Sequence, residues 1–226
     1  MCPVVRPAGV RAVRAYGRVT LRSVEISTAQ GPASVVIEKA RKPAFLLVMT
    51  HGAGGGTETA DVLAACEAAA GLGASVARVL QPYRVRGASA PGNAEKQDAA
   101  WLEIIAALRT AHQGIPLVQG GRSNGARVAC RTARAADASA VVALAFPLHP
   151  PGRPQLSRAD ELRAAGTDVL VVNGERDPFG IPAETDASRV VILPGETHSL
   201  SRHPQAVRAA VADWLGQLPW LRPGQQ

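Results

Sequence analysis

The feature that most constrains the fold is a regular alternation of short apolar runs with helical patterns. The runs are rich in Val and Leu and end at Gly, Pro, Asn or His, which is typical of strands buried on both faces of a sheet. Between them, apolar residues recur at helical spacing, as Trp101, Ile104, Ile105 and Leu108 do. Strands that alternate with helices predict an α/β fold with a mostly parallel central sheet and helices on both faces. The apolar runs cover residues 45–49, 76–80, 117–118, 141–146, 169–172 and 190–193.

Two further strands are expected ahead of this alternation. Residues 19–26 and 34–39 flank the turn signal Gly31-Pro32 and predict an antiparallel pair at one edge of the sheet. The sheet then has about seven to eight strands. A chain of 226 residues fits one domain, over residues 16–220, preceded by a flexible N-terminal arm at residues 1–15.

Composition narrows the class of protein. Hydrophobic residues make up 46% and charged residues 19% of the chain, as in globular rather than disordered proteins. The longest apolar stretch, near residues 141–146, is far shorter than the roughly 20 residues of a membrane span. The N-terminus has no continuous apolar signal core. We therefore expect neither membrane insertion nor secretion, and place the protein in the cytoplasm.

The cysteines give no sign of a metal site. Cys2, Cys66 and Cys130 are too scattered for a zinc site and cannot form a closed disulfide framework. Cys66 and Cys130 lie on apolar helical patterns, so they are predicted core residues. We expect no metal and no cofactor.

The basic charge points only weakly to nucleic acid. The net charge is +7, but the arginines are scattered, with one mild cluster between residues 6 and 22. Aromatic residues make up 4% of the chain, too few for a base-stacking platform. Nucleic-acid binding through the Arg-rich N-terminus is therefore kept only as a minor alternative.

The strongest local motif is Gly121-Arg122-Ser123-Asn124-Gly125, between a predicted strand and a helical stretch at residues 126–136. In that context G-x-S-x-G predicts a nucleophile elbow, in which a tight turn exposes the serine. Gly121 and Gly125 stand where the turn has no room for a Cβ atom. The helix N-terminus favours the negative charge that develops on an acyl substrate.

Two partners for Ser123 follow later in the chain. Asp177 comes after the strand at residues 169–172, and His198 lies between the last strand and the last helix. Glu175 is the competing acid, but the turn at residues 177–180 would present Asp177 from a rigid loop. The order Ser, Asp, His matches that of α/β-hydrolases, and all three residues fall at the carboxyl edge of the sheet.

A glycine-rich segment, His51-Gly52-Ala53-Gly54-Gly55-Gly56, follows another predicted strand. It lacks the glycine spacing of a dinucleotide fingerprint and the lysine of a phosphate loop. We expect the amide of Ala53, or that of Gly54, to form an oxyanion hole with the amide of Asn124, supported by Gly52 and Gly54. His51 is expected to be structural.

Together these motifs resemble the α/β-hydrolase superfamily over residues 17–218. Within it the chain resembles the small dienelactone-hydrolase-like branch that includes the testis-expressed hydrolase-like proteins and the hydrolase-like subunit of a histone-acetyltransferase complex. The resemblance implies a triad of Ser123, Asp177 and His198. It also implies little insertion between residues 146 and 169, hence one short helix at residues 156–165 and a minimal or absent cap. One departure is Asn124, where the branch often has Met. Further motifs that carry the resemblance are residues 81–84, 146–152 and 174–180.

The sequence therefore predicts a serine hydrolase of the esterase type that cleaves a small ester, thioester or related acyl substrate. Arg84, Arg86 and Arg122 lie near the expected site and would favour a carboxylate on the substrate, or would equally solvate the loops or pair with acids. The alternatives are a non-catalytic scaffold on the same fold, an acyltransferase with the same triad, and the nucleic-acid binder. The oligomeric state is left as monomer or homodimer.

Overall fold

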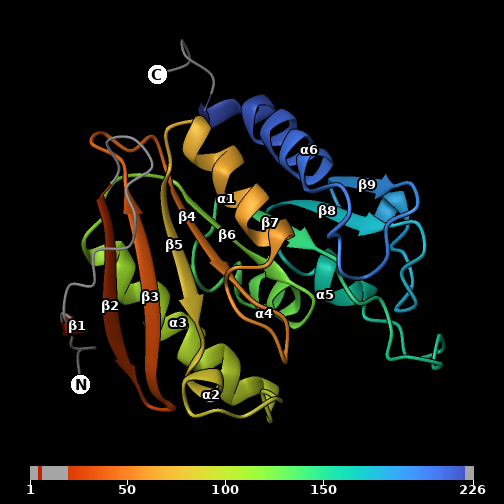
Figure 1. Cartoon of the computed structure of the whole chain (residues 1–226), viewed down its shortest axis with the longest axis horizontal. Helices are drawn as coiled ribbons and strands as arrows, with labels where there is room; N and C mark the ends of the chain where they lie inside the picture. Colours follow the sequence, from red (N-terminus) through yellow and green to blue (C-terminus); the bar gives the residue numbers. More distant parts are fainter. Residues whose placement is uncertain (1–4, 7–19, 222–226) are drawn as a thin grey trace.

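A nine-stranded sheet forms the centre of the computed structural model, which describes residues 5–6 and 20–221 (Figure 1). Its strand order is β1-β2-β3-β5-β4-β6-β7-β8-β9. The six neighbouring strands β5, β4, β6, β7, β8 and β9 run parallel to one another. Strands β1, β2 and β3 add an antiparallel edge beside β5. This arrangement confirms the predicted α/β-hydrolase type of sheet, with one strand more than the seven to eight expected, because β1 joins the edge from within the predicted N-terminal arm. The parallel strands are β4 (Leu46–Thr50), β5 (Ser75–Leu80), β6 (Leu117–Arg122), β7 (Ala140–Leu144), β8 (Asp168–Gly174) and β9 (Arg189–Leu193).

The antiparallel edge consists of β2 (Thr20–Thr28) and β3 (Gly31–Lys39), joined by a turn at Ala29 and Gln30. The turn was expected two residues later, at Gly31-Pro32. Instead Gly31 pairs with Thr28 at the start of β3, where its φ of +100° suits glycine. The Thr28 hydroxyl donates to the Gly31 carbonyl oxygen at 2.7 Å and closes the shorter loop.

A short strand, β1 (Val5–Arg6), pairs antiparallel with β2. The other residues of the predicted N-terminal arm, 1–4 and 7–15, lie outside the described residues. All the strands and helices that follow, from β2 onward, belong to the one sheet and the layers that cover it.

The two faces of the sheet are covered by different helices (Figure 1). Successive side chains of β4 alternate between them, as strand geometry requires. Leu47 and Met49 pack in the same cluster as α1 and α6, whereas Leu46 and Val48 pack in the cluster of α3. Both faces are therefore buried, which explains why the strand reads as one continuous apolar run. The longer helices are α1 (Ala60–Gly71), α3 (Ala94–Thr110), α4 (Asn124–Thr132) and α6 (Pro204–Gln217).

The remaining helical segments are short. Between β7 and β8 only α5 (Ala159–Arg163) interrupts the loop, so no cap domain is present there. The predicted helix at residues 156–165 was too long, because residues 156–158 are irregular, with Leu156 exposed, and the helix begins only at Ala159. The helix predicted at residues 126–136 likewise ends at Thr132 and continues only as turns. The others are α2 (Pro82–Val85) and the 3-10 helices Glu184–Asp186 and Pro219–Leu221.

Within the described ranges, no helix combines the length and the apolar character needed to cross a membrane.

Candidate active site

Ser123 lies at a sharp turn between β6 and α4, with a φ of 53° and a ψ of −115°. A positive φ is uncommon for a residue with a side chain and indicates a strained backbone. The neighbouring glycines make the turn possible. A Cβ atom on Gly121 would lie 2.5 Å from the carbonyl carbon of Gly125, and one on Gly125 would lie 2.7 Å from the His51 carbonyl oxygen. Both glycines are therefore required by close backbone approach.

The structure brings His198 and Asp177 together with this serine. The Nε2 atom of His198 lies 2.9 Å from the Ser123 hydroxyl oxygen, and its Nδ1 atom lies 2.8 Å from Asp177 Oδ2. The three residues come from the turn after β6, the turn after β8 and the loop after β9, all at the carboxyl ends of parallel strands (Figure 1). Such an arrangement can transfer a proton from the hydroxyl to the imidazole while the carboxylate orients the ring.

Asp177 is held by groups that the sequence did not single out. Its Oδ1 atom accepts the Phe179 amide hydrogen at 2.9 Å, and the side-chain amide of the fully buried Asn173 lies 3.4 Å from Oδ2. The Phe179 ring also packs on the His198 ring, with centroids 4.2 Å apart. Asn173 is the last residue but one of β8 and lies four residues before Asp177, and a polar residue in such an apolar run is a usable sequence signal.

The competing acid, Glu175, has a different role. Its carboxylate accepts the amide hydrogen of Gly195 at 2.9 Å, on the exposed side of the loop that carries His198. Asp177, not Glu175, contacts the imidazole. Glu175 instead ties the turn after β8 to the turn that leads to His198.

The glycine-rich segment after β4 lies against the elbow. A Cβ atom on Gly52 would come within 3.4 Å of the Ser123 Cβ atom. Neither the amide of Ala53 nor that of Asn124 donates to an acceptor among the described residues. Asn124 is the first residue of α4, so its amide belongs to the helix N-terminus, which favours negative charge. Both amides are free to donate to a developing oxyanion.

His51 is fully buried and holds this segment in place, as the sequence predicts. Its Nε2 atom accepts the Gln81 amide hydrogen at 3.0 Å, which leaves the hydrogen on Nδ1 to be donated to the Gly52 carbonyl oxygen at 2.8 Å. Burial lowers the pKa of the imidazole. The neutral ring is therefore the form that fits both bonds.

The three arginines near the site all have partners in the protein. Arg84 donates to the carbonyl oxygens of Gly55 and Ala88, and Arg86 donates to that of Gln30. Arg122 lies between the buried Asp61 and the main chain of His198. The sequence reasoning missed Asp61, which stands in the first turn of α1 after the glycine-rich segment, because no local pattern shows that this acid faces the elbow. Of the expectations for these arginines, pairing with an acid agrees with the contact between Arg122 and Asp61, while Arg84 and Arg86 bind loop carbonyl oxygens, which was not expected.

Cys66 and Cys130 are free and buried, as predicted for core residues. Burial raises the pKa of the Cys66 thiol to about 12 and also raises that of Cys130, so both remain protonated. In the part of the chain that the structure describes, no group of three or more His, Cys, Asp or Glu side chains is placed to hold a metal ion.

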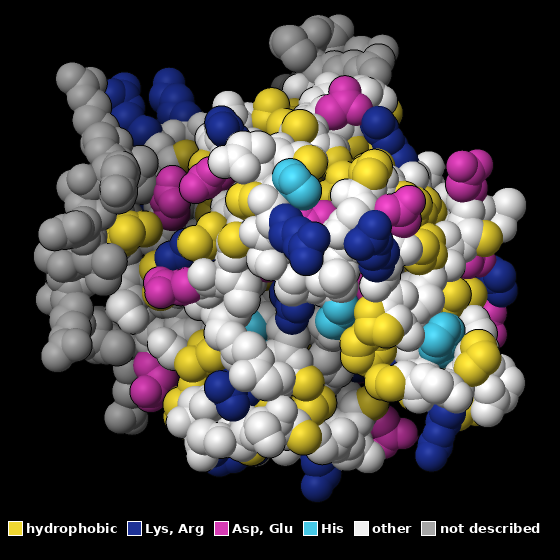
Figure 2. All heavy atoms as spheres, turned by 45° about the vertical axis from the view of Figure 1, so that its right-hand side comes forward, with side chains coloured by type: hydrophobic (Ala, Val, Ile, Leu, Met, Phe, Trp, Pro, Cys, Tyr) yellow, Lys and Arg dark blue, Asp and Glu magenta, His cyan; other side chains and the backbone are white. Residues whose placement is uncertain are grey.

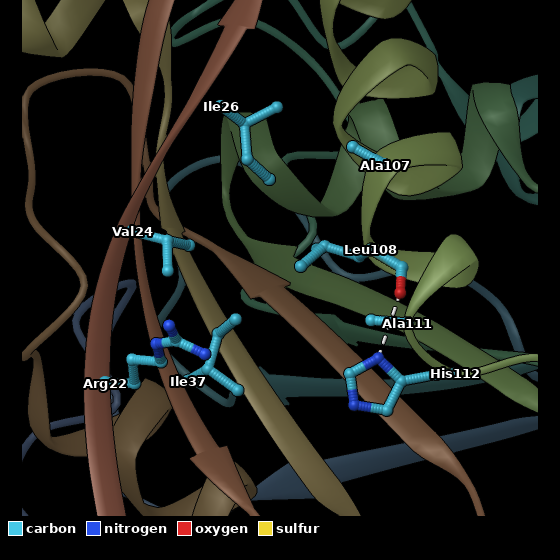
Figure 3. Close-up of a pocket in the computed structure, with 8 residues that line it drawn as sticks. All are labelled: Arg22, Val24, Ile26, Ile37, Ala107, Leu108, Ala111 and His112. Carbon is cyan, nitrogen blue, oxygen red and sulfur yellow. Dashed lines mark hydrogen bonds between the residues drawn. The ribbon is translucent and has the colours of Figure 1, made fainter. Parts of the chain in front are cut away.

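A cavity of about 220 Å³ lies away from these loops, between β2, β3 and the C-terminal end of α3 (Figure 3). Its described lining is mainly apolar and includes Val24, Ile26, Ile37 and Leu108. His112 lines its edge and donates from Nδ1 to the Leu108 carbonyl oxygen at 2.9 Å, as an extra bond at the end of α3. None of these lining residues contacts Ser123, Asp177 or His198, so we do not assign the cavity to the candidate active site.

The surface shown in Figure 2 has mixed charge. Lys and Arg side chains lie singly or in small groups among acidic, apolar and other side chains, and no continuous basic band crosses the described part of this face. Nothing on this face favours the nucleic-acid alternative.

Several solved structures share this fold. An alpha-beta serine hydrolase homologue from Coxiella burnetii superposes with a TM-score of 0.72, at 17% identity over 86% of this chain and 97% of its own. Dienelactone hydrolase from Anabaena variabilis gives 0.69, at 18% identity over 89% and 97%. Est1E from Butyrivibrio proteoclasticus, solved with ferulic acid, gives 0.69, at 16% identity over 83% and 95%.

These structural neighbours, at such low identity, show the fold. No curated protein matches the chain. The model of the family described as "Alpha/beta hydrolase domain" matches residues 43–205, which include the elbow, the turn after β8 and the His198 loop. Together these findings support a hydrolase, and the chain belongs to the alpha/beta hydrolase domain family.

Proposed function

We propose that the protein is a serine hydrolase of the esterase type, with Ser123 as nucleophile, His198 as general base and acid, and Asp177 as the orienting carboxylate. The observation that carries this proposal is the continuous chain of two hydrogen bonds, 2.8 Å from Asp177 to His198 and 2.9 Å from His198 to the hydroxyl at the strained elbow. Strain at that position is consistent with selection for an exposed nucleophile rather than for stability.

In the proposed reaction the Ser123 hydroxyl oxygen attacks the acyl carbon while His198 Nε2 accepts its proton. The negative charge on the former carbonyl oxygen is bound by the amides of Ala53 and Asn124. Each such donor contributes on the order of 3 kcal/mol to the transition state. Asp177 stabilises the imidazolium, which then gives the proton to the leaving group.

Water completes the cycle. With the alcohol or thiol gone, His198 takes a proton from a water molecule, whose oxygen attacks the acyl group on Ser123. The same donors bind the second oxyanion, and the serine is released with its proton restored. Because the segment between β7 and β8 holds only α5, nothing there could enclose a long acyl chain. We therefore propose small esters, thioesters or related acyl compounds as substrates.

The direct test is a series of nitrophenyl esters with acyl chains of increasing length. Wild type should release nitrophenol fastest from the shortest members, while Ser123→Ala and His198→Ala should lose at least a thousandfold in kcat, as removal of a triad member does. Hydrolysis that persists in folded Ser123→Ala would contradict the proposed nucleophile.

A second measurement distinguishes an enzyme from a non-catalytic scaffold. A fluorescent fluorophosphonate should label the wild type at Ser123, and the label should be absent from Ser123→Ala. Folded wild type that neither labels nor turns over any ester would favour the scaffold. Glu175→Gln is a suitable control, because Glu175 lies near the triad without contacting the imidazole, and its labelling should persist.

A further inference from the structure

The head group of Arg122 contacts three separate parts of the site. Its Nε atom lies 3.0 Å from Asp61 Oδ2 in the first turn of α1, and an Nη2 hydrogen is donated to the His198 carbonyl oxygen at 3.0 Å. Its Nη1 atom lies against Gly52, where a Cβ atom would approach it to 2.9 Å. Glycine at position 52 therefore leaves room for the guanidinium as well as for the elbow.

The bond from Arg122 is the one hydrogen bond to the main chain of His198 found among the described residues. The neighbouring parts of the loop have their own anchors. The buried Glu196 carboxylate accepts the His203 amide hydrogen at 2.6 Å, and the Glu196 carbonyl oxygen accepts that of Arg176 at 2.9 Å. Residue 198 itself lies between these anchors and is held to the elbow by Arg122.

Asp61 explains why the arginine can do this. Its side chain is completely buried, and Arg122 is its ion-pair partner among the described residues. A buried carboxylate that has lost its hydration requires such a partner. The contact between Arg122 Nε and Asp61 is an ion pair whose geometry is not that of a hydrogen bond. Because the guanidinium is planar and rigid, this charge contact restricts where Nη2 can donate.

We propose that Arg122, held by Asp61, is a positioning residue that fixes the main chain at His198 and so keeps its imidazole aligned between Ser123 and Asp177. Arg122 precedes the nucleophile by one residue, so the same side chain links the position of the base to that of the nucleophile. The inference rests on the proposed hydrolase function for its kinetic consequences, but its structural consequence can be measured independently.

The test uses a double variant, Asp61→Asn with Arg122→Gln, which removes the link without leaving one buried charge unpaired. Its matched control is Glu161→Gln with Arg127→Gln. Arg127 lies one turn along α4 and makes a partly buried, hydrogen-bonded pair with Glu161, at 2.9 Å and 2.5 Å, that does not reach His198. Glu161 also lies 3.5 Å from Arg131, whose guanidinium keeps its bonds to Asp98 in the control. Thermal unfolding of each variant establishes that it is folded.

The first readout is kinetic. With a short nitrophenyl ester, we expect kcat of the Asp61/Arg122 variant to fall roughly tenfold to hundredfold, the loss that a misplacement of about 1 Å produces. KM should stay within about twofold, since the guanidinium is not expected to touch the substrate. The Arg127 control should keep wild-type kcat.

The second readout does not depend on activity. In ¹⁵N-labelled protein, the hydrogen on His198 Nδ1 that is shared with Asp177 should give a low-field imidazole signal, assigned with His198→Gln. The Asp61/Arg122 variant should weaken or shift it, and the control should not. Single Arg122→Lys, which keeps a positive charge beside Asp61 but lacks the planar fork, should show an intermediate effect in both readouts.

Two results would overturn the inference. One is that the folded double variant keeps wild-type kcat and an unchanged His198 signal. If the double variant does not fold, the same result with Arg122→Lys counts equally. The other is a rise in KM restricted to esters that carry a carboxylate, again with an unchanged signal, which would make Arg122 a substrate-binding residue. If wild type hydrolyses no ester, the proposed function fails, yet the His198 signal still decides whether Arg122 positions the ring.

Discussion

The hydroxyl of Tyr83 donates a hydrogen bond to the carbonyl oxygen of Ala53 at 2.9 Å. Because the carbonyl and the N–H of one peptide unit point in opposite directions, this bond sets the direction of the Gly54 amide. His51 does the same for the preceding unit by donating to the Gly52 carbonyl, which sets the direction of the Ala53 amide. The two amides that the sequence offers as oxyanion donors are thus oriented by side chains from outside the glycine-rich segment.

Tyr83→Phe should lower kcat with little change in fold, because the bond to the Ala53 carbonyl also restrains Ala53, whose amide is the proposed oxyanion donor. A lost hydrogen bond of this kind is worth about 1 kcal/mol net, which corresponds to roughly a fivefold lower kcat if it is felt in the transition state. Steady-state kinetics with a short ester measures this. Thr110→Val, which removes a hydroxyl bonded within α3, is the control and should leave kcat unchanged. Equal kcat for Tyr83→Phe and wild type would show that the Tyr83 bond does not orient an oxyanion donor.

Stability should fall in mild acid because of His51. Burial lowers the pKa of this imidazole below its ordinary value of 6.5. Below that pH the unfolded chain takes up a proton that the folded protein resists, so the unfolded state binds more protons. The free energy of unfolding should then decrease as the pH falls below 6.5, by at most about 1.4 kcal/mol per pH unit.

Urea unfolding of wild type and His51→Gln over this range isolates the effect. The variant should be less stable at neutral pH, because two hydrogen bonds are lost, but should show a shallower decrease in acid. Parallel curves for the two proteins would mean that His51 does not account for the slope.

Two helical glycines should respond in opposite directions to alanine. In Gly125→Ala the new methyl would lie 2.7 Å from the His51 carbonyl oxygen, so the backbone must move, at a cost of roughly 1–3 kcal/mol. Gly216→Ala in α6 meets no atom within 4 Å and should stabilise the helix by roughly 0.5–1 kcal/mol. Urea denaturation gives both values. A Gly125→Ala protein as stable as wild type would contradict the close approach at the elbow.

Asn173→Ala should lower the free energy of unfolding and remove a contact that holds the Asp177 carboxylate. The side-chain oxygen of Asn173 accepts the Phe146 amide hydrogen at 2.8 Å, and its amide donates to the Phe146 carbonyl oxygen at 3.1 Å. Leaving these buried groups unpaired costs roughly 1–3 kcal/mol. The measured quantities are the free energy of unfolding and kcat.

Asn173→Asp gives a sharper outcome at the same position. It would place a second carboxyl about 3.4 Å from Asp177 Oδ2, and two carboxylates so close do not both ionise readily. The pH below which kcat falls should therefore shift upward relative to wild type. An unchanged pH profile would argue that Asn173 does not contact the orienting acid in solution.

The sequence predicted the parts of this site that depend on which residues follow each strand along the chain. Apolar runs locate the parallel strands because burial on both faces leaves no polar alternation. Ser123, Asp177 and His198 could be named because parallel strands bring their following loops to one edge. The local turn chemistry was harder to predict, since the turn falls at Ala29 and Gln30, which carry no turn signal of their own, while the signal at Gly31-Pro32 lies in β3.

What could not be predicted depends on packing between distant segments. Asp61 and Arg122 are far apart in the sequence, and nothing in either segment specifies that α1 directs a carboxylate toward the elbow. The bond between Tyr83 and Ala53 likewise joins two loops whose separation depends on how β4 and β5 pair. Such contacts depend on how the helices, strands and loops pack in three dimensions. The local sequence patterns give the bounds of each element only to within a residue or two.

The short connection between β7 and β8 has a consequence for the fate of an acylated serine. With only α5 in that connection, it supplies no cover domain that has to open before a product diffuses away. Bulk solvent would then reach the acyl group as soon as the leaving group departs. Because water is in large excess over dilute alcohols or amines, such an architecture favours net cleavage over transfer to a second acceptor.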